Sequence, residues 1–200
     1  AGIYRDHGIE VCSLGVFTNL IEPDDEKREA ILAYFERHLQ YAAEAGIPMI
    51  TPTATHVDVT KDGDNIFRSC FIDPFQGSMM AVFAKESLNI QKVAIIYNTS
   101  DDYSDGLHQS FKAKAEELGM EVVEIKGYGK DATDFNAELT AILAKDPDAI
   151  YVPDYYGTDA LIATQARALG YDKPLLGCDG WDGVLDVLDE NKYNVVNNVY

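Results

Sequence analysis

The sequence has little positive charge, few cysteines and no long apolar run. Its 200 residues include 16 Lys and Arg against 34 Asp and Glu, which gives a formal net charge of −18. A chain this acidic repels phosphate backbones and anionic lipid headgroups, so we expect no nucleic-acid partner and no membrane insertion. The apolar runs, such as residues 93–97, are far too short to cross a bilayer.

Motifs of metal, nucleotide and nucleophile chemistry are also missing. Cys12, Cys70 and Cys178 are widely spaced, and we interpret them as small buried side chains, with a single disulfide as the open alternative. The histidines are not at metal-ligand spacing, and no G-x-G-x-x-G, Walker or Gly-x-Ser-x-Gly pattern occurs. We therefore expect no metal, no cofactor and no catalytic residue. An export signal is missing too, so it either was removed or was never part of this sequence.

Short β-branched runs alternate with amphipathic helical patterns, which is typical of parallel βα units. The expected strands are residues 10–17, 47–51, 66–71, 92–97, 121–125, 149–152, 174–177 and the start of one more at 198–200. The expected helices are residues 23–45, 76–88, 104–118, 134–144, 158–169 and 184–188. From residue 66 onward, this alternation predicts an α/β fold with a doubly wound, three-layer parallel sheet of the flavodoxin or Rossmann type.

Aromatic and acidic residues alternate just after three of the expected strands. These loops are residues 98–104, 153–156 and 178–182. Doubly wound sheets hold their ligands at the carboxyl ends of the strands. Phosphates favour glycine-rich turns and lysine, which these loops lack, whereas aromatic walls and a carboxylate suit a small ligand that carries an ammonium group.

Six segments of the chain, taken in order, resemble the type I periplasmic solute-binding proteins of ABC transporters, in the leucine/isoleucine/valine-binding class. The segments are residues 46–55, 67–77, 97–107, 133–135, 165–170 and 176–181. In that family the ligand lies between two lobes. The resemblance therefore implies a lobe of such a protein over residues 45–200, a periplasmic or extracellular location for the parent family, and docking of that family on an ABC permease.

The resemblance also implies roles for individual residues. One turn would hold the carboxylate of an amino acid with hydroxyl and backbone N–H donors, and it consists of Thr53, Ala54 and Thr55. The second lobe would supply two aromatic walls and the acid that meets the ammonium group, and these residues are Tyr103, Tyr155 and Asp179. Asp73 and Gln76 would also reach the cleft. A zwitterion needs this arrangement of donors at one end and an acceptor at the other.

Residues 1–46 resemble a different family. The segment Ser13-Leu14-Gly15, the acidic turn at 23–26 and the helix end Ala45-Gly46-Ile47-Pro48 resemble one βα unit of the xylose-isomerase-like TIM-barrel sugar isomerases and epimerases. One such unit lacks the several strands that an isomerase site needs, so Glu10 and Asn19 are interpreted as inherited and not catalytic. We hypothesise an engineered chimera, in which a barrel fragment (1–46) and a binding-protein segment (47–200) form one compact unit.

The leading functional hypothesis is a non-enzymatic α/β domain that carries part of an amino-acid site. Binding should be weak or lost, because a single lobe leaves one face of the ligand in water. The alternatives are a metal-dependent sugar isomerase or epimerase, which a test of metal dependence would identify, and a scaffold with no ligand. We expect the chain itself in the cytoplasm of an expression host, as a mixture of monomer and homodimer, because an uncovered sheet edge favours pairing.

Overall fold

The computed structural model describes residues 6–7, 23–61 and 63–200. The chain divides into two compact units, Ala1–Cys70 and Phe71–Tyr200. This division lies after residue 70, whereas the sequence patterns place a boundary at residue 46. That residues 1–46 and 47–200 form one compact unit stays a prediction. The expected strand at 10–17 lies outside the described residues.

The first unit contains one long helix and a small sheet. Its elements are α2 (Asp25–Ala45), β1 (Met49–Thr51), η1 (Val57–Thr60) and β2 (Ile66–Arg68). Asp24 caps the start of α2, and its carboxylate accepts a hydrogen bond from the Lys27 N–H at 3.0 Å. Strands β1 and β2 run parallel, with Met49 opposite Ile66. Helix α2 has no buried residue.

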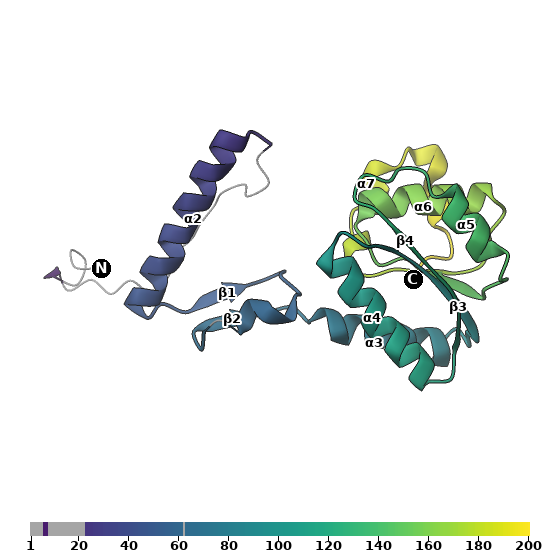
Figure 1. The fold of residues 1–200 in the computed structure, drawn as a ribbon, viewed down its shortest axis with the longest axis horizontal. Helices are drawn as coiled ribbons and strands as arrows, with labels where there is room; N and C mark the ends of the chain where they lie inside the picture. Colours follow the sequence, from purple (N-terminus) through teal and green to yellow (C-terminus); the bar gives the residue numbers. More distant parts are fainter. Residues whose placement is uncertain (1–5, 8–22, 62) are drawn as a thin grey trace. The chain divides into compact units, whose positions relative to one another are not determined.

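The second unit is built on a four-stranded parallel sheet (Figure 1). Its strands are β3 (Lys92–Asn98), β4 (Glu121–Tyr128), β5 (Ala149–Tyr151) and β6 (Leu175–Leu176). Its helices are α3 (Asp73–Glu86), α4 (Asp102–Glu117), α5 (Asn136–Leu143), α6 (Tyr156–Ala168) and α7 (Val184–Val187), with 3-10 turns η2 (Asp179–Trp181) and η3 (Glu190–Val196). The strand order is β4-β3-β5-β6. A parallel bridge from Leu175 to Val199 adds a short extended segment beside β6, where the sequence predicts the start of one more strand at 198–200.

Two apolar cores cover the two faces of this sheet. One core joins the buried side chains of α3 and α4 to Val93, Ile95 and Tyr151, and the other joins α5 and α6 to Ile96 and Ile150. Figure 1 shows α3 and α4 packed together, away from α5 and α6. The second unit is therefore a three-layer, doubly wound sheet, as predicted, but the predicted strand at 66–71 is not part of it, because β2 pairs with β1 in the first unit. Because the chain runs from β3 outward to β4 and then back to β5, the direction of winding reverses between β3 and β5, where such folds bind their ligands.

Several elements differ in length from the predicted ranges. Strand β4 continues to Tyr128, because its hydrogen bonding with β3 persists to the pair Asn98–Tyr128 despite the polar Lys126. Helix α3 begins at Asp73, since Pro74 is tolerated in a first turn. Cys70 and Cys178 are free thiols, so no disulfide joins them, and they are half-buried where the sequence analysis expected buried side chains. Cys12 lies outside the described residues.

Candidate functional site

Three of the predicted ligand residues meet at the carboxyl end of the sheet. Tyr103 lies in the first turn of α4 after β3, Tyr155 precedes α6 after β5, and Asp179 opens η2 after β6. The rings of Tyr103 and Tyr155 stack, with centroids 4.8 Å apart and an interplanar angle of 24°. The Tyr103 hydroxyl donates a short hydrogen bond to the Asp179 carboxylate. We call these three residues the loop trio.

The Tyr103 side chain is held in place from both ends. At its backbone, the Asp101 carboxylate caps α4 and accepts hydrogen bonds from the N–H groups of Tyr103 and Ser104, both at 3.0 Å. At its tip, the hydroxyl oxygen accepts a hydrogen bond from the Gly180 N–H at 3.0 Å. Burial raises the pKa of Tyr103 far above its usual range, and the nearby thiol of Cys178 adds to the shift. The hydroxyl therefore keeps its proton and remains a donor to the carboxylate.

Tyr155 is more exposed than Tyr103, and its backbone N–H is bound by the buried carboxylate of Asp154. Asp154 accepts a hydrogen bond from the Tyr155 N–H at 2.7 Å and a short one from the Tyr128 hydroxyl. Burial raises the pKa of Asp154, although these two hydrogen bonds oppose the shift. Tyr155 itself is 49% exposed, and burial, with the charges of Asp101 and Asp154, raises its pKa to about 12. Its ring is thus available to a ligand while its backbone is fixed.

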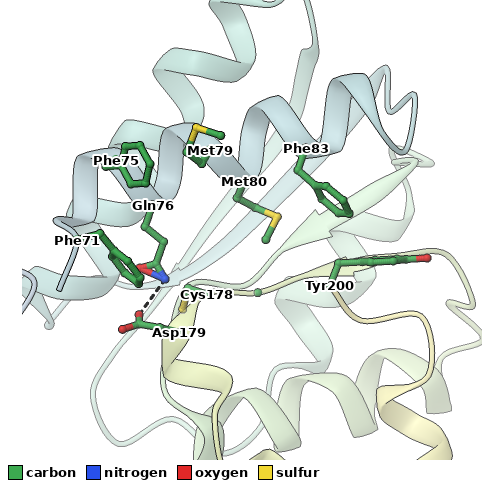
Figure 2. Close-up of a pocket in the computed structure, with 10 residues that line it drawn as sticks. Phe71, Phe75, Gln76, Met79, Met80, Phe83, Cys178, Asp179 and Tyr200 are labelled. Carbon is green, nitrogen blue, oxygen red and sulfur yellow. Dashed lines mark hydrogen bonds between the residues drawn. The ribbon is translucent and has the colours of Figure 1, made fainter. Parts of the chain in front are cut away.

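Asp179 receives two hydrogen bonds on the same oxygen. Besides the Tyr103 hydroxyl, the side-chain amide of Gln76 donates to Asp179 Oδ1, with Nε2 and Oδ1 2.9 Å apart (Figure 2). Within the described residues no hydrogen bond reaches the second oxygen, Oδ2. The next residue must be small, because a Cβ on Gly180 would lie 2.3 Å from the Asp154 carbonyl oxygen. Asp179 can therefore accept a charged donor from a ligand through Oδ2.

A cavity of about 470 Å³ lies beside Asp179, between α3 and the last strands of the sheet. Figure 2 shows Gln76 and Asp179 at one end of this cavity and Tyr200 toward the other. Its lining is mostly apolar and consists of Phe71, Phe75, Gln76, Met79, Met80, Phe83, Gly177, Cys178, Asp179 and Tyr200. We call it the α3 cavity. Its single carboxylate stands among aromatic rings and thioethers.

The predicted carboxylate-binding turn belongs to the first unit. The Ala54 N–H donates to Thr51 Oγ1 at 3.1 Å, and the Ala54 carbonyl accepts from the Cys70 thiol at 3.5 Å. Thr55 is buried, whereas Thr53 is exposed. This turn lies in the first unit and the loop trio in the second, so their joint site stays a prediction.

Two further buried side chains lie near these loops, Trp181 and Asp159. The Trp181 indole N–H donates to the Val152 carbonyl at 2.8 Å, which makes Trp181 a packing residue. Asp159, in the first turn of α6, is 0% exposed, and neither of its carboxylate oxygens has a hydrogen-bond partner in the described part of the chain. Burial raises the pKa of Asp159 strongly, and the neighbouring charge of Asp154 adds to the shift.

The described part of the chain contains neither a metal-binding cluster nor a membrane-spanning helix. Across residues 6–7, 23–61 and 63–200, no group of three or more His, Cys, Asp or Glu side chains is placed to hold a metal ion. No helix in those ranges is both long and apolar enough to cross a bilayer.

Comparisons with known proteins agree on one family. Residues 25–199 match the family described as periplasmic binding protein. A Leu/Ile/Val-binding protein homolog from Brucella melitensis is 31% identical over 139 residues, and the Leu/Ile/Val-binding protein BraC3 from Rhizobium johnstonii is 33% identical over 139 residues. Each alignment covers 69% of this chain and 38% of the relative. The chain thus spans well under half the length of these relatives.

Solved structures give the same result. The leucine-binding protein LivK from Thermotoga maritima is 40% identical, with a TM-score of 0.63, over 71% of this chain and 40% of that one. The substrate-binding protein LivJ from Streptococcus pneumoniae, solved in complex with isoleucine, is 39% identical, with a TM-score of 0.62, over 68% of this chain and 38% of that one. The relatives are binding proteins and not enzymes, which confirms the prediction of a non-enzymatic protein.

No finding supports the resemblance of residues 1–46 to a TIM-barrel unit, nor a designed fusion at residues 45–48. The family match begins at residue 25 and includes α2 and the helix end at Gly46. Gly46 has φ +65°, and its N–H bonds to carbonyls of the last helical turn, as in any αL-terminated helix. Such a helix end leads into a strand in many parallel α/β folds, so the motif does not distinguish a barrel from an open sheet. The sugar isomerase alternative is likewise unsupported.

Proposed function

Because the chain belongs to the periplasmic binding protein family, we propose that it forms one wall of a binding site for a zwitterionic amino acid with a branched apolar side chain. The observation that carries this proposal is the convergence of the loop trio at the carboxyl ends of three strands, where Asp179 Oδ2 receives no hydrogen bond from the described residues. Relatives of this chain are named as leucine-binding or Leu/Ile/Val-binding proteins, and these names support the choice of ligand.

The chemistry of the loop trio favours the ammonium end of the ligand. A primary ammonium group would pair with Asp179 Oδ2 and lie against the exposed ring of Tyr155. The carboxylates of Asp101 and Asp154 lie close by and make this region unfavourable for the carboxylate end of the ligand. We propose that Thr53, Ala54 and Thr55 receive that end.

We propose that the affinity is weak. The matched part of this chain covers only 38% of each relative, and a wall that contacts only one face of the ligand leaves the other face in water. We further propose that the protein acts in the periplasm and delivers its amino acid to an ABC permease, as the family membership supports.

A ligand series monitored by thermal unfolding tests the proposal. Ligand binding to the folded state adds RT ln(1 + [L]/Kd), so leucine at ten times Kd would raise stability by about 1.4 kcal/mol and Tm by roughly 3–6 °C. We expect a shift with L-leucine, L-isoleucine or L-valine and a smaller one with 4-methylpentanoate, which lacks the ammonium group. Asp179→Asn should abolish the leucine shift, whereas Asp182→Asn, at an exposed position on the same segment, should preserve it. Equal shifts in both variants, or no shift with any amino acid, would refute the proposed function.

A further inference from the structure

Gln76 connects the start of α3 to the loop that carries Asp179. The two residues are 103 positions apart in the sequence, and their side chains meet with Nε2 and Oδ1 at 2.9 Å (Figure 2). The amide nitrogen is the donor in this pair, because the Gln76 carbonyl has no proton to donate to a carboxylate oxygen. This bond is the one hydrogen bond that Gln76 makes through its side chain within the described residues.

The carbonyl oxygen of the Gln76 amide argues against a purely structural role for this residue. Its Oε1 atom is buried and has no hydrogen-bond partner in the described part of the chain. A buried carbonyl oxygen without a partner destabilises the fold, so an apolar side chain of similar size would pack there at a lower cost. The benefit of glutamine at this position must therefore come from what its N–H group does to Asp179.

The N–H group of Gln76 adds a second restraint to an exposed carboxylate that the Tyr103 hydroxyl alone would hold at one point. With Gln76 and Tyr103 both donating to Oδ1, the carboxylate plane is fixed from α3 and from α4, and Oδ2 is left as the free acceptor. An acceptor that is already oriented loses less entropy when a ligand binds.

We propose that Gln76 is a positioning residue, which orients Asp179 so that Oδ2 receives the ammonium group of the ligand. This inference rests on the proposed function and deepens it. Gln76 acts through Asp179, so removing the Gln76 amide should weaken binding of ligands that carry an ammonium group and spare those that do not.

The test compares Gln76→Met with a matched control. Gln109 makes the same type of bond on the exposed surface of α4, where its Nε2 donates to Asp105 Oδ2 at 2.6 Å, so Gln109→Met removes an equivalent pair away from the loop trio. NMR titrations with L-leucine and with 4-methylpentanoate measure both affinities. We expect Gln76→Met to weaken leucine binding about tenfold, equivalent to one lost hydrogen bond to a charged group, and to leave 4-methylpentanoate unchanged. Equal weakening for both ligands, or none for leucine, would overturn the proposal.

A second readout needs no ligand and separates this inference from the proposed function. Three-bond couplings report the χ1 rotamer of Asp179 in the free protein. We expect one rotamer in the wild type and in Gln109→Met, and averaged couplings in Gln76→Met. If the wild type binds no amino acid, averaged couplings in Gln76→Met still support positioning, and wild-type couplings in that variant refute it. Should Gln76→Met fail to fold, Gln76→Glu places a second carboxylate against Asp179 and should displace its rotamer in the same assay.

Discussion

Asp159 should make the protein less stable as the pH rises above about 4. Its carboxyl group is completely buried in the first turn of α6, without a hydrogen-bond partner among the described residues, and burial, assisted by the charge of Asp154, raises its pKa strongly. In the unfolded chain the same group ionises near its ordinary pKa of about 3.9. The folded state therefore binds one more proton than the unfolded state at any pH between these two pKa values.

The sign and size of the effect follow from that single proton. Stability changes with pH in proportion to the protons bound by the unfolded state minus those bound by the folded state, and here this difference is negative. The free energy of unfolding should thus fall by about 1.4 kcal/mol per pH unit through Asp159, until the folded carboxyl ionises. Asp159→Asn has nearly the same shape and no titratable proton, so it should gain up to about 2.7 kcal/mol relative to the wild type between pH 5 and pH 7.

Urea unfolding followed by far-UV circular dichroism at pH 5, 6 and 7 measures this difference. Asp154 also has a raised pKa, but it is present in both proteins and its contribution largely cancels in the comparison. Asp186→Asn, at an exposed site on α7, is the control and should follow the wild-type pH dependence. Parallel stability curves for the wild type and Asp159→Asn would show that the carboxyl group is not held protonated in the fold.

Three further predictions concern the supports of the loop trio and the assembly state. Tyr128→Phe removes the hydrogen-bond donor to the buried Asp154 and should lower the free energy of unfolding in urea by about 1–3 kcal/mol. Tyr193→Phe, at an exposed site, should leave this free energy almost unchanged, and equal losses in the two variants would contradict the role of the bond. Asp101→Ala removes the cap of α4 and should lower the free energy of unfolding by about 1 kcal/mol and weaken leucine binding, whereas Asp102→Ala should do neither. Unchanged leucine binding in Asp101→Ala would show that the cap does not support the binding site. Light scattering over a dilution series should show a monomer–dimer mixture, because the α3 cavity leaves aromatic rings exposed, and a constant monomer mass would exclude it.

The alternation of strand and helix patterns predicted the second unit well, because its strands are short apolar runs and the helices between them have clear start and stop signals in the sequence. The same pattern placed the loops that contain Tyr103, Tyr155 and Asp179 at one edge of the sheet, where the structure has them, since residues that follow parallel strands must gather there; their role in binding stays a prediction. Residues 1–46 were harder to interpret. Their helix ends at a glycine in the αL conformation, and this local chemistry is shared by unrelated parallel folds.

The sequence resemblance pointed to Gln76 as a residue that reaches the cleft, but it gave neither the bond between Gln76 and Asp179 nor the burial of Asp159. Both Gln76 and Asp159 lie in first helical turns, where polar residues are ordinarily exposed, and only the packing of α3 and α6 shows which of them are covered. The bond between Tyr128 and Asp154 depends on the length of β4, which extends past its apolar run. Each of these contacts joins segments that are distant in the sequence, and no local pattern encodes such a distance.

Trp181, described above for its bond to the Val152 carbonyl, gives the protein an intrinsic optical probe. It is the single tryptophan of the sequence, it is 7% exposed, and it lies two positions after Asp179. Its fluorescence therefore reports on the second unit alone and from beside the loop trio, without any label. If the first unit unfolds on its own, the circular dichroism signal will change in urea while the tryptophan emission stays constant. Emission that instead tracks the circular dichroism at every urea concentration would show that the two units unfold together.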